Sequence, residues 1–182
     1  MFIQTEPTPN PATLKFLPGT VVMGHGTADF ADSSRAGKSP LATRLFAVDG
    51  VTSVFLGTDF ITVAKTDASD WQTVKPQILA AIMEHFSSGQ PVMDEGSEDA
   101  ADTGEDSGIV MQIKELLDTR VRPAVAQDGG DIIFRAFEDG IVYLHLQGAC
   151  SGCPSSSATL KHGIENMLKY YVPEVMAVQA VD

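Results

Sequence analysis

Cysteine and basic residues are both scarce in this sequence. Its 182 residues include 2 Cys and 12 Lys or Arg against 24 Asp or Glu, which makes the formal net charge −12. Two cysteines are too few for the disulfide framework of a small secreted module. The excess of acids argues against a protein that holds nucleic acid or anionic lipid by bulk positive charge. We therefore expect neither as a partner.

Long hydrophobic runs are also missing. No segment reaches the roughly 18 to 20 uninterrupted apolar residues that a membrane span requires. Residues 1–17 have neither the basic and then apolar pattern of a signal peptide nor the Arg-rich amphipathic pattern of a transit peptide. We therefore expect no membrane partner, and either a cytosolic protein or a mature form without its targeting segment.

The excess acids gather in one stretch, residues 88–108. It contains seven of the 24 acids and no Lys or Arg, and Gly, Ser, Ala and Thr fill most of the rest. Such a composition buries too little apolar surface to fold, so we predict a flexible acidic linker there. It separates a domain at 1–87, with 8 acids and 6 bases, from a domain at 109–182, with 9 acids and 6 bases.

The pattern of residues 1–87 predicts strands and helices in one small domain. Strands are expected at 2–5 and 13–17, and a hairpin at 51–56 and 60–65. Ser39 and Asp70 stand where N-caps are expected, before helices that begin at 40 and 71. Pro76 is expected to bend the second of these helices locally. The Gly- and Ser-rich region before Ser39 predicts no definite structure.

The second domain gives clearer signals. A helix is expected over 109–125, disturbed near Pro123, and strands over 132–138 and 141–147. Asp139-Gly140 between these strands indicates a type I′ hairpin turn. A helix from Pro154 and a strand over 175–181 follow. The fold class predicted for the chain is α+β, with two small domains that each have a sheet covered by helices on one face.

Both cysteines lie between a strand and a helix, in the window 148–154, which reads GACSGCP. A two-residue spacer allows the sulfurs of Cys150 and Cys153 to face one centre, and the start of the following helix favours thiolate. Iron–sulfur clusters and structural zinc sites take about four thiolates. A second copy of the chain would complete the set through a twofold axis, at an exposed loop.

Three functions use such a pair: cluster binding, a zinc-bridged structural dimer, and thiol–disulfide exchange. The expected order of helix, hairpin, C-x-x-C and helix differs from the βαβ start of thioredoxin-like proteins. His145 and His162 lack the spacing of zinc-finger ligands, and we expect an ordinary sheet position and a solvent-facing residue. Asp128 and Asp131 are expected to serve a turn, not a cation.

These residues resemble a known family. Segment 117–134, with its Asp-Gly-Gly-Asp at 128–131, and segment 146–156 around the cysteines look like the NifU C-terminal (Nfu) domain. Segments 5–19 and 39–63 resemble the N-terminal domain that accompanies it in bacterial and mitochondrial Nfu-type proteins. The resemblance covers nearly the whole chain except the acidic linker.

The resemblance implies an iron–sulfur scaffold or carrier and not an enzyme. It implies one labile [4Fe–4S] cluster per homodimer, bound by Cys150 and Cys153 of each copy, although [2Fe–2S] also takes four thiolates. The implied partners are a second copy of the chain, an upstream cluster donor and apo iron–sulfur client proteins, which the first domain would recognise. The implied location is the bacterial cytoplasm or, alternatively, the mitochondrial matrix.

Overall fold

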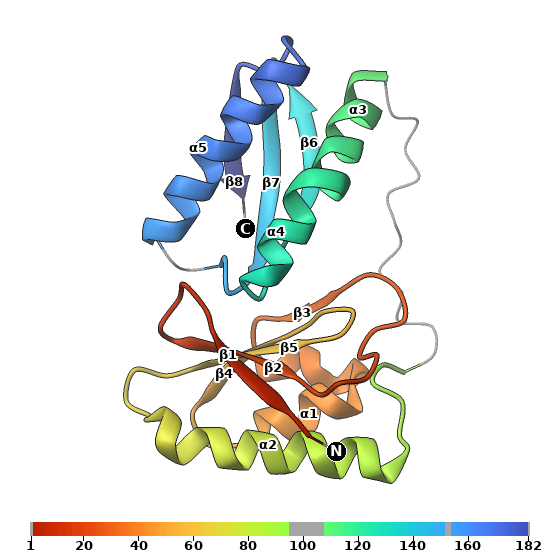
Figure 1. Cartoon of the computed structure of the whole chain (residues 1–182), viewed down its shortest axis with the longest axis vertical. Helices are drawn as coiled ribbons and strands as arrows, with labels where there is room; N and C mark the ends of the chain where they lie inside the picture. The colour runs from red at the N-terminus through yellow and green to blue at the C-terminus, as the bar shows by residue number, and fades with distance from the viewer. Residues whose placement is uncertain (1, 95–107, 152–153, 182) are drawn as a thin grey trace. The chain divides into compact units, whose positions relative to one another are not determined.

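A computed structural model describes residues 2–94, 108–151 and 154–181 of the chain. It divides the chain into two compact units, Met1–Asp99 and Ala100–Asp182 (Figure 1). Each unit has a β-sheet with helices packed on one of its faces, so the predicted α+β class is confirmed.

Unit 1 is built on a five-stranded antiparallel sheet with the order β1-β2-β5-β4-β3. The strands are β1 (Gln4–Pro7), β2 (Thr13–Leu17), β3 (Ala28–Phe30), β4 (Val51–Leu56) and β5 (Ile61–Lys65). The helical elements are the 3-10 segment η1 (Ser33–Lys38), α1 (Pro40–Phe46) and α2 (Trp71–Ser88). Both α-helices lie on the same face of the sheet (Figure 1).

The two α-helices of unit 1 begin where their caps predict. The Ser39 side chain accepts a hydrogen bond from the backbone N–H of Ala42 (3.1 Å), and the Asp70 carboxylate accepts one from Gln72 (3.1 Å). Each cap satisfies a backbone donor that the first turn of a helix leaves free. Helix α2 continues across Pro76 as one element.

The residues that follow α2 return to unit 1. The backbone N–H of Asp94 donates to the carbonyl oxygen of Lys38 (2.9 Å), and Val92 packs against the hydrophobic core. The first residues of the predicted linker 88–108 therefore pack on unit 1. Residues 95–107 lie outside the described residues.

Unit 2 has a three-stranded sheet with the order β6-β7-β8. Its elements are α3 (Gly108–Leu116), the π-helical turn η2 (Leu117–Val121), α4 (Arg122–Gln127), β6 (Gly130–Glu138), β7 (Ile141–Gly148), α5 (Pro154–Tyr171) and β8 (Ala177–Val181). Strands β6 and β7 are antiparallel, whereas β7 and β8 are parallel and α5 forms the crossover between them. The helices cover one face of the sheet (Figure 1).

Two local predictions for unit 2 are confirmed. The first helix is disturbed just before Pro123, where the backbone N–H of Arg122 donates to Leu117 O, five residues earlier. A wider turn of this kind accommodates the ring and the missing donor of proline. In the β6–β7 turn, Asp139 and Gly140 have φ angles of 50° and 76°, as a type I′ turn requires.

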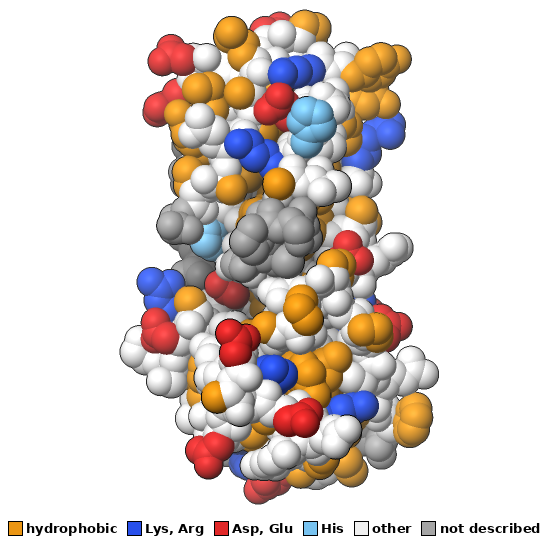
Figure 2. All heavy atoms as spheres, turned by 90° about the vertical axis from the view of Figure 1, so that its left-hand side faces the viewer, with side chains coloured by type: hydrophobic (Ala, Val, Ile, Leu, Met, Phe, Trp, Pro, Cys, Tyr) orange, Lys and Arg blue, Asp and Glu red, His pale blue; other side chains and the backbone are white. Residues whose placement is uncertain are grey.

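The described surface carries charges of both signs. On the face drawn in Figure 2, acidic and basic side chains are interspersed among hydrophobic ones on each unit. This mixture agrees with the nearly balanced counts of acids and bases in the two predicted domains. Within the described ranges, the helices are too short or too polar to cross a bilayer.

Candidate functional site in the cysteine loop

The loop between β7 and α5 carries the first of the two cysteines. Gly148, the last residue of β7, has a φ of 64°, and the N–H of Ser151 donates to its carbonyl oxygen (3.1 Å), so the chain turns sharply. Cys150 lies inside this turn and is buried. Cys153 lies outside the described residues, and α5 begins at the next residue, Pro154.

The Cys150 side chain is only 7% exposed and belongs to the hydrophobic core of unit 2. The expectation of an exposed site is therefore wrong for this thiol. The reason is the neighbouring strand. A Cβ atom placed on Gly130 would lie 2.5 Å from Cys150 Sγ and 2.9 Å from the carbonyl oxygen of Gln147. Because glycine leaves that space free, the thiol fills it.

The Asp-Gly-Gly-Asp segment at 128–131 holds the other side of the loop, with a turn at its first two residues and the start of β6 at its last two. Gly129 has a φ of 79°, and its carbonyl oxygen accepts a hydrogen bond from the N–H of Ala149 (3.1 Å). The buried Asp131 carboxylate accepts hydrogen bonds from Nε and Nη2 of Arg122, both at 2.9 Å. It also accepts a hydrogen bond from the backbone N–H of Ile132 (2.8 Å). These contacts connect α4 and β6 to the cysteine loop.

The ion pair with Arg122 compensates the buried negative charge of Asp131. Asp131 is 3% exposed, and a carboxylate buried to that degree is costly unless it is paired and hydrogen-bonded. The bidentate guanidinium supplies both requirements. Hydrogen bonds to Asp131 raise the pKa of Arg122 above its ordinary value, with a smaller contribution from Asp118. Arg122 thus carries a permanent positive charge beside the loop.

Within the described part of the chain, no group of three or more His, Cys, Asp or Glu side chains is arranged to hold a metal ion. The two-residue spacing and the N-terminal end of the 18-residue helix α5 suit an anionic group bound by sulfur. A metal centre with four ligands would need two more than Cys150 and Cys153 supply.

Two family models match the chain, one in each unit. Residues 3–89 match the model described as "Scaffold protein Nfu/NifU N terminal". Residues 113–179 match the model described as "NifU-like domain". The chain belongs to the NifU-like (Nfu) family.

Relatives of this Nfu chain include two proteins named "NFU1 iron-sulfur cluster scaffold homolog, mitochondrial". The one from Drosophila ananassae is 54% identical over 185 residues, and the one from Drosophila virilis is 55% identical over 185 residues. Both matches cover 100% of the chain, which spans 64% and 62% of the length of those relatives.

Solved structures also resemble parts of this Nfu chain. The solution structure of a NifU-like protein from Saccharomyces cerevisiae has 27% identity and a TM-score of 0.47, and the match covers 52% of this chain and 86% of that protein. The crystal structure of a Staphylococcus aureus protein has 28% identity and a TM-score of 0.40, with 45% and 99% covered.

The polar residues considered in the sequence lie where this Nfu fold needs them. Asp128 lies in the turn, as predicted, and its N–H donates to Val125 O at the end of α4. Asp131 is instead the second residue of β6, where it pairs with Arg122. His145 lies in the sheet with Nδ1 3.1 Å from the carbonyl oxygen of Val181, and His162 is exposed. Both histidine predictions are confirmed.

Sequence reasoning missed the roles of Arg122 and Gly130. Two adjacent glycines in the turn were a usable signal, because the left-handed φ of Gly129 explains only one of them. The second, Gly130, leaves room for the Cys150 thiol. Arg122 was harder to find, since it lies nine residues before Asp131 and follows no repeat that links the two.

Proposed function

We propose that this Nfu protein binds an iron–sulfur cluster through Cys150 and Cys153 and passes it to apo-proteins, as a scaffold or carrier and not as an enzyme. The observation that carries the proposal is the position of Cys150 in a glycine-lined turn directly before α5, with the second cysteine three positions later. The names of the Drosophila relatives, which contain the words iron-sulfur cluster scaffold, support it.

The proposed site is shared between two copies of the chain. One chain supplies two thiolates, and its described residues offer no metal-binding cluster that would replace the missing two. Four thiolates at the interface of a symmetric homodimer satisfy a [4Fe–4S] cluster, so we propose one such cluster per dimer. Binding of the cluster then depends on association of the two chains.

Transfer proceeds by thiolate exchange in this proposal. A client thiol replaces Cys150 or Cys153 on iron and gives its proton to the departing thiolate, so charge is conserved and no oxidant or reductant takes part. Because Cys150 is buried when it packs beside Gly130, the loop has to turn this thiol outward before it reaches iron. Replacing all four thiolates releases the cluster and separates the two copies.

The proposed partners are a second copy of the chain, an upstream cluster donor and apo iron–sulfur clients. The Drosophila relatives carry the word mitochondrial in their names. This favours the mitochondrial matrix, the second of the two compartments expected from the sequence, and these names give no support to the bacterial cytoplasm. We therefore assign the proposed activity to the mitochondrial matrix.

Metal and sulfide analysis of protein purified or reconstituted without oxygen tests the function. We expect iron and acid-labile sulfide in equal amounts with a broad absorbance near about 400 nm, and loss of both in Cys150→Ser and Cys153→Ser. Ser151→Ala, at the exposed position next to Cys150, is the matched control and should keep the cluster. Zinc without colour would indicate a structural dimer instead, and a metal-free protein that reduces disulfides would indicate an oxidoreductase.

A further inference from the structure

Strand β1 is the end strand of the sheet in unit 1. Its pairing with β2 runs from Gln4 opposite Leu17 to Pro7 opposite Leu14. No described strand pairs with its other side. Such an edge presents backbone N–H and C=O groups that can pair with another extended chain. The strand has four residues, which is enough for a short added strand but too short for extensive aggregation.

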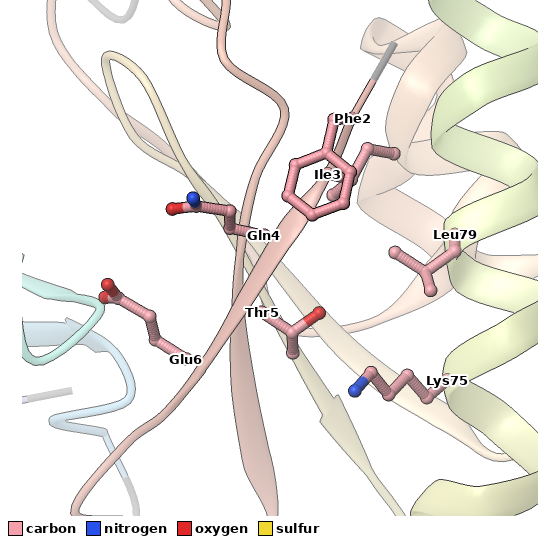
Figure 3. Close-up of a pocket in the computed structure, with 7 residues that line it drawn as sticks. All are labelled: Phe2, Ile3, Gln4, Thr5, Glu6, Lys75 and Leu79. Atoms are coloured by element: carbon pink, nitrogen blue, oxygen red, sulfur yellow. The ribbon is translucent and has the colours of Figure 1, made fainter.

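A groove runs between this edge and helix α2. Its cavity volume is about 490 Å³, and its lining includes the β1 segment together with Lys75 and Leu79 of α2. Figure 3 shows the Thr5 side chain extending from β1 toward Lys75 of α2, and Phe2 and Ile3 also line the groove. Phe2 is 80% exposed, an unusual degree for so large an apolar side chain. The groove therefore combines a free strand edge with an apolar contact surface.

One charge in the groove, that of Lys75, has no counter-ion among the described residues. The ammonium group of Lys75 points toward the Thr5 end of β1 (Figure 3), and the described residues place no carboxylate within ion-pair distance of it. Glu6, the acid of β1, points to the other side of the strand and pairs with Lys15 (3.7 Å). A ligand of this groove would therefore gain from a negative charge near Lys75.

We propose that this groove binds an extended acidic segment of a partner protein. The segment pairs with the free edge of β1, places an apolar side chain against Phe2 and Leu79, and places a carboxylate beside Lys75. The proposal rests on the proposed carrier function, because a carrier has to recognise its clients through a surface other than the cysteines that it gives up during transfer. It assigns that recognition to unit 1.

The test uses the full chain without cluster and a short synthetic peptide of alternating Val and Thr with one central Glu. We expect changes in backbone NMR signals at residues 2–7 and around Lys75, and binding weakened about tenfold by Lys75→Glu. Exchanging the peptide Glu for Lys should restore binding to this variant and weaken binding to the unchanged protein. Lys161→Glu, on the exposed surface of α5, makes the same charge change and should have no effect.

Two further measurements separate the explanations. A peptide with alternate backbone amides methylated should lose binding if strand pairing is required. If the methylated and unmethylated peptides bind equally well, the proposed strand pairing is contradicted.

A second measurement replaces the acids of 95–106 by amides. If this shifts the β1 signals of the free protein, the chain's own acidic segment is the occupant and the proposal is overturned. Equal binding of the Glu and Lys peptides, or no change at β1, also overturns it. Cys150→Ser should bind the peptide normally. Failure of the groove proposal can therefore be distinguished from failure of the proposed cluster binding.

Discussion

At the scale of single residues, the cysteine loop depends on the absence of a side chain at Gly130. We predict that Gly130→Ala forces Cys150 out of its present position, because the new methyl group would lie 2.5 Å from its sulfur. Overpacking of this kind destabilises a domain by about 1–3 kcal/mol. Thermal unfolding followed by NMR signals of unit 2 measures the loss, and iron analysis after reconstitution measures the effect on the cluster.

Gly163→Ala is the matched control for this substitution. Gly163 lies within α5, and no atom lies within 4 Å of the Cβ that alanine would add. Alanine is the better helix former, so this variant should be more stable by about 0.5–1 kcal/mol. If Gly130→Ala is as stable as the unchanged protein and binds as much iron, position 130 does not need to lack a side chain and the prediction is wrong.

The ion pair beside the loop leads to a second prediction at this scale. Arg122→Gln leaves the buried Asp131 carboxylate without its bidentate partner. We expect a loss of about 2–3 kcal/mol, below the range for fully buried pairs because the Arg122 side chain is 36% exposed. Denaturant unfolding of unit 2 measures it. Asp118→Asn removes the exposed second partner of Arg122 and should cost less than about 0.5 kcal/mol. Equal losses in the two variants would contradict this account.

The sequence identified both cysteines but not the residues that position them. Cysteine spacing is a local pattern, so it can be read from seven consecutive letters. The contact of Gly130 with Cys150, by contrast, depends on the register that pairs Gly130 with Gly148 across β6 and β7. A charge pair such as Arg122 with Asp131 requires knowledge of where α4 lies against β6. Neither the glycine–cysteine contact nor the ion pair follows from the spacing of these residues in the sequence.

At the scale of elements, the sequence predicted those with local signals. Caps at Ser39 and Asp70 and the Asp139-Gly140 turn are decided by a few neighbouring residues, and they were predicted correctly. Strand β3 was not predicted, because it has three residues and is held by pairing with β4. The parallel pairing of β7 with β8 was not predicted either, since it follows from the path of α5 across the sheet.

Helix α2 contains a buried histidine, from which we expect the stability of unit 1 to depend on pH. His85 is 0% exposed, and neither ring nitrogen has a hydrogen-bond partner among the described residues. Burial lowers the pKa of His85, and the charge of Arg44 lowers it further. The unfolded chain therefore binds a proton more readily than the folded one. Stability is complete above the ordinary pKa of about 6.5 and falls as the pH drops below it.

We predict that His85→Leu removes this pH dependence. The unchanged protein should lose up to about 1.4 kcal/mol per pH unit below about pH 6.5 from this residue, and the variant should lose clearly less. Fluorescence of Trp71, the single Trp of the chain, reports the unfolding of unit 1. His25→Gln changes an exposed histidine of the same unit and should leave the profile as it is. Parallel profiles for His85→Leu and the unchanged protein would contradict the prediction.

At the scale of the whole molecule, the proposed recognition surface and the proposed cluster site lie in different units. Unit 1 has its own core and the β1 groove, whereas unit 2 has a separate core that includes Cys150. The net charge of −12 belongs largely to residues 88–108, and both folded parts are nearly balanced. An acidic connection of this kind repels other acidic segments from itself. In the proposed groove, a single residue, Lys75, would contact the charge of the partner segment.

The proposed sharing of one cluster between two copies predicts that the assembly state depends on the cargo. We predict that the cluster-loaded protein is a dimer with two iron atoms per chain, as one [4Fe–4S] cluster per dimer requires, and that chelation of iron returns it to monomers. Because two chains must meet to hold one cluster, dilution in the presence of a chelator should speed cluster loss. Light scattering and absorbance measure both effects. Cys150→Ser should remain monomeric at every concentration under the same reconstitution. Cluster loss that is independent of dilution, or a monomer that carries the full cluster, would contradict the shared site, and one iron atom per chain would indicate [2Fe–2S] instead.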